Sequence, residues 1–384
     1  MQFFRRTLRF EGDVCEYWYG HNGPDAVVEV LGSIPSSRFL VVCDPLVEQL
    51  YGERYAERLE KYAPSNLLVH PVGEKSKTLR TVETLGNKAL EYGADRRTAV
   101  VAVGGGLTGN LSGLLAALLF RGISFAHVPT TLLAMLDSVF SQKQAVNSRH
   151  GKNAFGAFRL PKLIVADTSH IGTLPADEVR SSLCEVIKNA LAIAPEYIDT
   201  LKGQLNVEGC YVPDSISSLI DFSLRSKQTV MESDRYETGP ALVCEYGHTV
   251  GHVLEHVGGI AHGSAIGVGM LVAAELSAMR GGLTAAEVSV HYDLLERNGS
   301  LQESLLTTIG KLDARTVVDA AMFDNKKGYL PVNSDAVAMV LLERLGQPYR
   351  TRAGVPLVAV HRTELRTAIE RVQELMAVGV RRFT

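Results

Sequence analysis

Residues 98–110, TAVVAVGGGLTGN, decide the fold of this chain. The apolar residues that open this stretch, at 98–103, predict a short strand buried on both faces. A glycine-rich turn follows at residues 104–110, and residues 111–120 then predict a helix. Glycines let a backbone approach a phosphate closely, and a helix start offers free N–H groups and a positive dipole end. Because such turns also serve tight packing of helix on strand, this turn alone leaves dinucleotide binding open.

Strands of the same kind occur on both sides of this stretch. Short apolar runs lie at residues 38–44, 66–70, 123–128 and 163–167, and helical segments such as 45–63 and 78–93 separate them. Alternation of this kind predicts a Rossmann-like parallel sheet covered by helices. From about residue 173 the pattern changes to long helical periods, at 176–194, 215–232 and 262–280. We therefore expect an α/β domain over residues 1–170 and an all-α domain over residues 171–384.

Polar residues follow three of these strands where the strands end. Asp44 ends one strand, residues 73–77 (GEKSK) follow another, and Thr130 and Thr131 follow a third. Ligands of open α/β sheets bind at the carboxyl ends of strands, where an acidic residue can bind ribose hydroxyls. These positions therefore favour one cofactor site that includes the glycine turn.

A second group of polar residues suggests a metal ion. His248 and His252 lie four residues apart in the segment 245–252 (EYGHTVGH), so they share one face of a helix. His262 follows ten residues later, and Glu185 lies in an apolar helical segment. A carboxylate with imidazoles and no thiolate favours zinc, cobalt or iron. The simplest interpretation uses both helical histidines as ligands, and packing of a plain helix face is the alternative.

The segments 137–147 and 151–153 are polar and lie between hydrophobic blocks. Lys143, Lys152 and Asn153 could project from such a loop onto an anionic ligand, and Arg121 adds a cation nearby. A solvated loop explains the same composition. If these cations do surround a metal and a dinucleotide, they suit a phosphorylated sugar as the substrate, because they could bind its phosphate.

Composition limits the classes of function. With 384 residues, 46% hydrophobic and 21% charged, the chain has room for two domains. A net charge of −3 gives no basic field, so nucleic acid is not an expected partner. The apolar stretch 111–120 is about half of a membrane span, and we expect no membrane segment. Five scattered cysteines without CxxC spacing, and no signal-peptide pattern, favour a cytoplasmic protein.

Taken in order along the chain, these motifs resemble the sugar phosphate cyclase family, whose best-known member is 3-dehydroquinate synthase. The resemblance rests on residues 104–110, 121–122, 129–131, 137–147, 151–153, 185–188, 227, 234, 247–252, 262–263 and 324–326. It implies the dehydroquinate synthase-like fold, bound NAD, and a divalent metal, cobalt or zinc. It also implies a homodimer, in which Arg121 reaches the phosphate in a neighbouring subunit.

The resemblance assigns roles to individual residues. It implies the metal ligands Glu185, His248 and His262, and this replaces the simpler pair of helical histidines. The residues around NAD would be Asp44, Glu74, Lys77, Gly105, Gly106, Leu107, Thr108, Gly109, Thr130, Thr131, Lys152 and Asn153. The substrate contacts would be Arg121, Asp137, Lys188, Lys227, His252 and Lys326.

Two residues are the expected catalytic groups. Lys143 would orient and polarise the reacting hydroxyls, and Glu245 would move protons. Three residues before His248, Glu245 is expected one turn earlier on the metal-facing side of the same helix. A surface glutamate at a helix start, favoured by the helix dipole, is the alternative.

Details within the family indicate the substrate. 3-Dehydroquinate synthases have an arginine and an asparagine where this chain has Ala241 and Glu245, and that arginine helps to hold a substrate carboxylate. They also have two glycines before the lysine, where this chain has Ser-Gln at 141–142. The segments 137–139, 143–147, 245–248 and 324–329 resemble members that act on D-glucose 6-phosphate in aminoglycoside antibiotic biosynthesis. Ser264 departs from the family pattern, which has a glutamate two residues after the last metal ligand.

The implied reaction uses NAD catalytically. The sugar is oxidised at C4, loses phosphate from C6, is reduced again at C4, and closes a carbocycle by an aldol step. Another cyclase, acting on sedoheptulose 7-phosphate or making 3-dehydroquinate, is the nearest alternative. An iron-dependent polyol dehydrogenase and a non-catalytic binding protein are the others.

Overall fold

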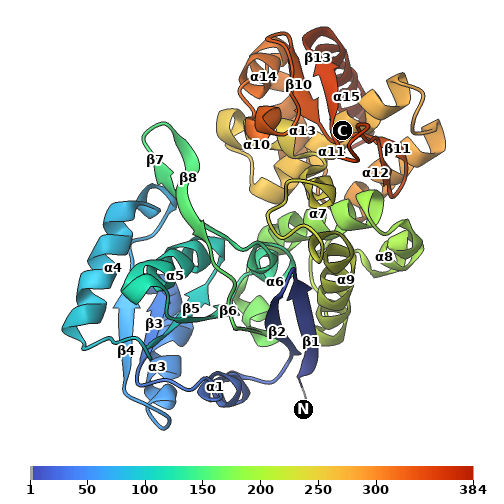
Figure 1. The fold of residues 1–384 in the computed structure, drawn as a ribbon. Coiled ribbons are helices and arrows are strands. Elements are labelled where there is room, and N and C mark those ends of the chain that lie inside the picture. Colours follow the sequence, from blue (N-terminus) through green and yellow to red (C-terminus); the bar gives the residue numbers. More distant parts are fainter. Residues whose placement is uncertain (1–2, 384) are drawn as a thin grey trace. The chain divides into compact units, whose positions relative to one another are not determined.

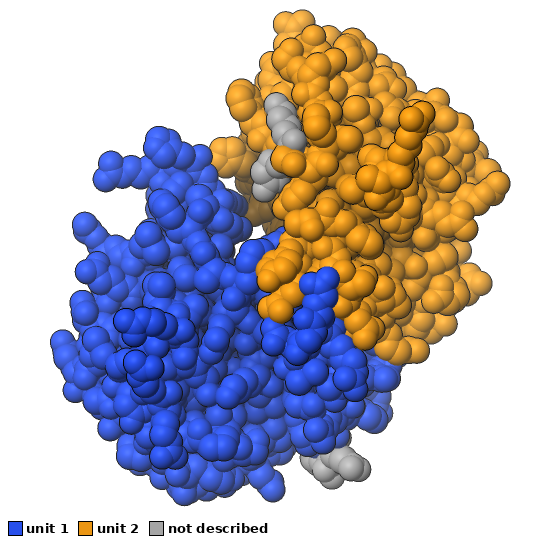
Figure 2. All heavy atoms as spheres, in the orientation of Figure 1, with its two compact units in different colours: residues 1–174, 212–221 blue, residues 175–211, 222–384 orange. Residues whose placement is uncertain are grey.

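The computed structural model describes residues 3–383, without the side chains of residues 325, 327 and 378–383. The chain forms two compact units, coloured separately in Figure 2. Unit 1 comprises Met1–Leu174 and Val212–Asp221, and unit 2 comprises Pro175–Tyr211 and Phe222–Thr384. The expected domain boundary after residue 170 lies four residues before this division, and the return of residues 212–221 to unit 1 was not expected.

Unit 1 is built on a seven-stranded sheet with the order β1-β2-β9-β6-β5-β3-β4 (Figure 1). Its strands are β1 (Phe4–Phe10), β2 (Asp13–Gly20), β3 (Phe39–Cys43), β4 (Ser65–Val69), β5 (Ala99–Gly104), β6 (Ser124–Pro129) and β9 (Leu163–Asp167). All neighbouring strands pair in parallel except β1 and β2, which form an antiparallel hairpin. The parallel α/β sheet is thus confirmed, and the hairpin at its edge is an addition to the expected strands.

Helices cover both faces of this sheet because its central strands are apolar on both sides. Every residue of β3, β5 and β9 is buried. On one face, Val41 and Val101 pack with residues of α1 (Pro24–Gly32) and α3 (Glu53–Leu59). On the other face, Leu40 and Val100 pack with residues of α4 (Leu79–Glu91) and α5 (Gly106–Leu118). The alternation of side chains along each strand therefore supplies two hydrophobic cores.

The polar segment 137–158 forms a short turn and then a hairpin of β7 (Lys143–Ser148) and β8 (Gly151–Phe158), and is not a plain loop. Figure 1 shows this hairpin projecting beyond the main sheet of unit 1. Strand β7 packs on α5, where Gln144 occupies the space that a side chain at Gly113 would fill. The α6 helix (Leu132–Leu136) precedes the hairpin. Most of β8 is exposed, whereas β7 is buried over residues 144–146.

Unit 2 is mainly helical. Its helices are α7 (Ala176–Ala192), α8 (Ile198–Gln204), the later part of α9 (Pro213–Met231), α10 (His248–Gly258), α11 (His262–Met279), α12 (Ala285–Arg297), α13 (Glu303–Lys311), α14 (Ala314–Ala321) and α15 (Arg362–Phe383). Two small antiparallel sheets correct the all-helical expectation: β10 (Ala336–Met339) with β13 (Val358–His361), and β11 (Leu342–Arg344) with β12 (Gln347–Pro348).

Helix α11 lies at the centre of unit 2 and contacts α7, α10, α12 and α15. It is also the one described helix that is long and apolar enough, by length and composition, to cross a membrane. Most of it, 78%, is buried within the protein, as in the core helix of a packed domain. A helix was expected at residues 262–280, whereas the longest apolar run in the sequence lies at residues 111–120.

Candidate metal and cofactor sites

The glycine-rich turn of unit 1 joins β5 to α5. Gly105 is the N-cap of α5 and makes no side-chain cap, so the first N–H groups of the helix are left without that partner. Gly104 has φ +157°, and a Cβ there would lie 2.5 Å from Thr108 Oγ1. A Cβ on Gly109 would lie 2.5 Å from the ring of His127, which is buried beneath the turn. The turn therefore has the form of a phosphate-binding helix start.

The other expected cofactor residues of unit 1 have defined structural partners. Asp44 follows β3, and its Oδ1 accepts from the backbone N–H groups of residues 46 and 47 at 2.9 and 3.0 Å. Thr131 caps α6 by accepting from the Ala134 N–H (3.2 Å), and the Thr130 N–H donates to the Gly104 carbonyl (3.1 Å). Lys77 is buried, and its ammonium donates to Asn153 Oδ1 (2.5 Å). Asp44 and Thr131 thus each use one side-chain oxygen for helix capping.

The charged residues expected near the substrate in unit 1 are less enclosed. Lys143 begins β7 and is exposed, and Lys152 lies on the exposed strand β8. Arg121 is also exposed and has φ +67°, directly after Phe120 with φ +51°. Asp137 ends α6.

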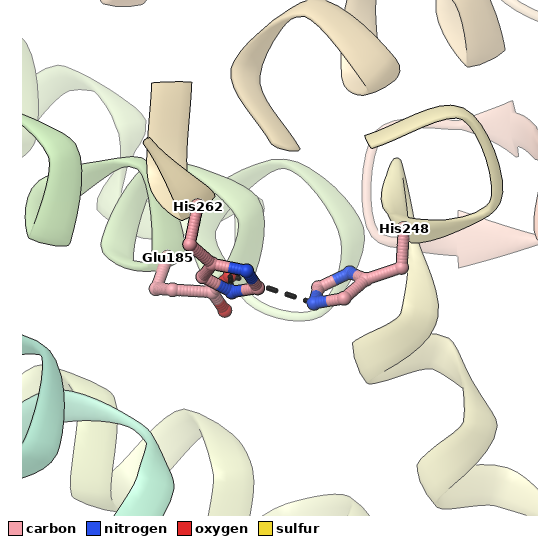
Figure 3. A group of neighbouring side chains, drawn as sticks. All are labelled: Glu185, His248 and His262. Atoms are coloured by element: carbon pink, nitrogen blue, oxygen red, sulfur yellow. Dashed lines mark ion pairs between the residues drawn. The ribbon is translucent and has the colours of Figure 1, made fainter. Parts of the chain in front are cut away.

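In unit 2, three helices bring Glu185, His248 and His262 together (Figure 3). Glu185 lies on α7, His248 is the first residue of α10, and His262 is the first residue of α11. Lys188 forms an ion pair with Glu185 Oε2. The other oxygen, Oε1, lies 3.6 Å from Nε2 of each histidine. Buried Glu185 Oε1 has no hydrogen-bond partner among the described residues.

This arrangement fits a metal ion. Two ligands that are each about 2.1 Å from one ion, at tetrahedral angles, lie about 3.4 Å apart. The two 3.6 Å separations are close to that value and long for hydrogen bonds. A buried carboxylate oxygen with no partner is costly unless something binds it, and a divalent cation would do so. One carboxylate and two imidazoles are a ligand set of zinc or cobalt.

Both histidines are oriented through their other ring nitrogen. Nδ1 of His248 donates to the Tyr246 carbonyl (3.2 Å), and Nδ1 of His262 donates to Glu255 Oε2 (3.2 Å). Hydrogen bonds of this kind fix the ring and leave Nε2 to face the metal. Glu255 was not singled out from the sequence, although it lies seven residues after His248 and so on the same face of the helix.

The pKa values of the two histidines differ because their charged neighbours differ. Burial, reinforced by the Lys188 charge, lowers the pKa of His248 to about 3. Burial also acts against protonation of His262, but Glu185 and Glu255 outweigh it and raise its pKa to about 10. Burial opposes ionisation of Glu185, yet Lys188 and the two imidazoles hold its pKa well below the ordinary value. In the metal-free protein, His262 is therefore protonated, and its positive charge lies between the carboxylates of Glu185 and Glu255.

His252 lies one turn after His248 and is exposed. Its ring centroid is 5.2 Å from that of His248, and its ligand atom groups with Glu255 and His262 rather than with Glu185. The structure therefore does not bring the pair at i and i+4 together around Glu185. The two histidines whose Nε2 atoms lie near Glu185 Oε1 are His248 and His262, the pair implied by the family resemblance.

Direct backbone contacts fix the separation of the three helices. A Cβ on Gly263 would lie 1.7 Å from the Ser181 carbonyl oxygen of α7. A Cβ on Gly269 would lie 2.0 Å from the carbonyl oxygen of Gly247, which precedes α10. Gly247 itself has φ +80°, so the chain turns sharply into His248. Side chains at these points would push α11 away from its neighbours.

Glu245 does not lie on α10, which corrects the expectation from its spacing. It ends the 3-10 helix η7 (Pro240–Glu245), and the left-handed Gly247 separates that helix from α10. Its Oε2 is 3.2 Å from Nζ of Lys326, which is buried and also paired with Asp324 (2.9 Å). Burial lowers the pKa of Lys326, but Glu245 and Asp324 outweigh it, so the pKa is raised.

The remaining expected substrate residues of unit 2 are buried. Lys188 is paired with Glu185, and Lys227 lies in α9 with 5% of its surface exposed. Asp234 is a residue to which sequence analysis gave no role. Its carboxylate accepts from the backbone N–H groups of Thr238 (3.0 Å), Gly239 (2.7 Å) and Ala241 (2.9 Å). It thereby fixes the turn that leads to Glu245.

Known proteins resemble most of the chain. Residues 67–181 match the family described as 3-dehydroquinate synthase N-terminal, and residues 182–327 match 3-dehydroquinate synthase C-terminal. A 2-deoxy-scyllo-inosose synthase of Streptoalloteichus tenebrarius is 48% identical over 356 residues, which are 91% of each chain.

Solved structures extend this likeness to the fold. A 2-deoxy-scyllo-inosose synthase in complex with carbaglucose-6-phosphate, NAD+ and Co2+ superimposes with a TM-score of 0.89 and 36% identity, over 96% of this chain and 100% of that one. A 2-epi-5-epi-valiolone synthase of Streptomyces hygroscopicus, with NAD+ and Zn2+ bound, shares the fold with a TM-score of 0.79 and 23% identity, over 96% of this chain and 99% of that one.

Proposed function

We propose, from the premise that this chain belongs to the 3-dehydroquinate synthase family of sugar phosphate cyclases, that it has 2-deoxy-scyllo-inosose synthase activity. The reaction converts D-glucose 6-phosphate into 2-deoxy-scyllo-inosose and inorganic phosphate. NAD and a divalent metal, Co2+ or Zn2+, are the cofactors, as in the related structures. Because phosphate leaves by cleavage of a carbon–oxygen bond, the enzyme is a lyase.

The pair Ala241 and Glu245 supports this choice of substrate within the family. Ala241 has an uncharged methyl side chain, so its position supplies no cation for a substrate carboxylate. Glucose 6-phosphate has no carboxylate, whereas a 3-dehydroquinate synthase must bind one. This observation, in a chain 48% identical to a 2-deoxy-scyllo-inosose synthase, is the one on which the proposal rests.

The chain's own residues suit the cofactors. The uncapped start of α5 and the glycines before it would receive the pyrophosphate of NAD. Glu185, His248 and His262 would hold the metal. Bound NAD supplies reversible hydride transfer, and the bound metal supplies Lewis-acid polarisation of sugar hydroxyls.

Proton transfer falls to residues of the chain. Glu245 would take the proton from the carbon next to the oxidised centre and return one during cyclisation. The Lys326 ammonium, 3.2 Å from Glu245 Oε2, keeps that carboxylate oriented, and Asp324 holds Lys326 in turn. Lys143 would donate to a reacting hydroxyl oxygen. Lys188, Lys227, His252 and Arg121 would contact the substrate or its phosphate.

The test is a phosphate-release assay of the purified protein with NAD and Co2+. D-Glucose 6-phosphate should give phosphate and a carbocycle in equal amounts, with no net NADH. Glu185→Gln is the control variant, because it should lose phosphate release and still bind NAD. Release from sedoheptulose 7-phosphate alone would point to the other cyclase, and net NADH from an unphosphorylated polyol would point to a dehydrogenase.

The quaternary state and compartment are part of the proposal. Arg121 is exposed, as a residue that serves a neighbouring subunit must be, and this supports a homodimer. None of the five cysteines, all of them within the described residues, is joined in a disulfide, and this supports a reducing, cytoplasmic location. Light scattering on the purified protein tests the dimer, since a monomer that is fully active would exclude a role for Arg121 across subunits.

A further inference from the structure

Asn147, a residue with no assigned role, bonds to two segments, the 74–77 turn and β8, whose residues Glu74, Lys77 and Asn153 the family resemblance places around NAD. It lies near the end of β7, partly buried. Its backbone N–H donates to the Lys77 carbonyl (2.8 Å). Its side-chain amide donates to Glu74 Oε1 (2.7 Å) and to the Glu74 carbonyl (3.3 Å). Its side-chain oxygen accepts from the Asn153 N–H (2.8 Å).

The two segments that Asn147 joins are mostly exposed, so burial contributes little to fixing their relative position. The 3-10 turn η2 (Glu74–Ser76) is exposed, and so is β8, which contains Asn153. Asn153 has φ +54°, a left-handed conformation that is uncommon outside glycine and that asparagine adopts more readily than most residues. The backbone N–H of Asn153 donates to Asn147 Oδ1, and the side-chain oxygen of Asn153 accepts from the Lys77 ammonium (2.5 Å). Asn147 therefore contributes to the orientation of Glu74, Lys77 and Asn153 at once.

We propose that Asn147 is a positioning residue for NAD: it holds the 74–77 turn and the β7–β8 hairpin in the arrangement that binds the cofactor. An asparagine is required because one end of its amide must donate to a carboxylate while the other accepts from a backbone N–H. The inference rests on the proposed function, since it assumes that these residues contact NAD.

The decisive variant is Asn147→Asp. It keeps the oxygen that accepts from Asn153 but places a second carboxylate against Glu74, where the amide donated at 2.7 Å. Ser148→Ala is the matched control, because Ser148 accepts from the His150 N–H (3.0 Å) within the same hairpin and has no described bond to the 74–77 turn. Calorimetric titration with NAD should show Kd raised about tenfold or more for Asn147→Asp and less than twofold for Ser148→Ala.

Rescue distinguishes positioning from general stability. In Glu74→Gln/Asn147→Asp the donor and acceptor are exchanged, so the double variant should bind NAD more tightly than the two single variants predict by addition. Melting temperatures are measured alongside, and Asn147→Ser, which removes the links without adding charge, replaces Asn147→Asp if that variant does not fold. A Kd within twofold of wild type, or strictly additive losses, would overturn the inference. Wild-type protein that binds no NAD would instead refute the proposed function, on which the inference depends.

Discussion

Replacing Glu255 by glutamine should weaken metal binding without changing any metal ligand. Glu255 Oε2 accepts from Nδ1 of His262 at 3.2 Å, and about a quarter of each side chain is exposed. A hydrogen bond to a charged group contributes about 1.5–3 kcal/mol when buried, and partial exposure reduces this toward the lower end. A loss of about 1.4 kcal/mol corresponds to a tenfold higher Kd for the metal. Glu255→Ala, which leaves no acceptor, should approach the upper range of about 100-fold.

The assay is competition for Co2+ or Zn2+ between the protein and a chelator of known affinity. His256→Gln is the matched control, because His256 is the next residue on α10 and is exposed. NAD affinity and melting temperature of the metal-free protein serve as checks that the variant is folded. If Glu255→Gln and His256→Gln give the same competition curve as wild type, Glu255 does not orient His262 toward the metal.

Other outcomes follow from the same geometry. Glu245→Gln should lower turnover about 10²-fold or more, with NAD and metal still bound, and a variant within a few-fold of wild type would place the proton transfer elsewhere. His248→Ala should lose more metal affinity than His252→Ala, and equal losses by chelator competition would contradict the ligand set. Because the pKa of His262 is raised from 6.5 to about 10, its stabilisation of the metal-free protein is complete below pH 6.5 and is lost as pH rises toward 10. Thermal melts without metal should fall across that window for wild type, and His262→Gln should flatten the trend.

The parallel strands could be predicted because burial on both faces demands continuous apolar residues. Strand β5 reads AVVAVG and strand β9 reads LIVAD, with no polar interruption before the strand end. The β1–β2 hairpin was not predicted because its strands, FRRTLRF and DVCEYWYG, contain charged residues that interrupt the apolar pattern, and β1 is exposed along most of its length. The return of residues 212–221 to unit 1 is a long-range contact, illustrated by Tyr19 donating to Asp221 at 2.6 Å, and no local pattern encodes it.

The spacing of residues in the sequence could predict only part of the metal site. The i, i+4 pattern correctly placed His248 and His252 on one helix, but it could not show which ring faces Glu185. That choice depends on the left-handed Gly247 and on where α11 begins, both of which are tertiary features. The position of Glu255 beside the histidines could have been predicted, since positions i, i+4 and i+7 share a helix face. The error for Glu245 arose because helical spacing was extended backward past Gly247, the left-handed N-cap at which α10 begins.

The close approach of Gly263 to Ser181, and of Gly269 to Gly247, affects how this enzyme could be engineered. The spacing of the three helices is set by main-chain atoms in contact, and not by interchangeable side chains. Libraries aimed at new sugar substrates can therefore vary the polar residues around the proposed metal site while the spacing of Glu185, His248 and His262 stays constant. The three glycines should be excluded from such libraries, because even alanine at Gly263 would place a methyl group 1.7 Å from a carbonyl oxygen.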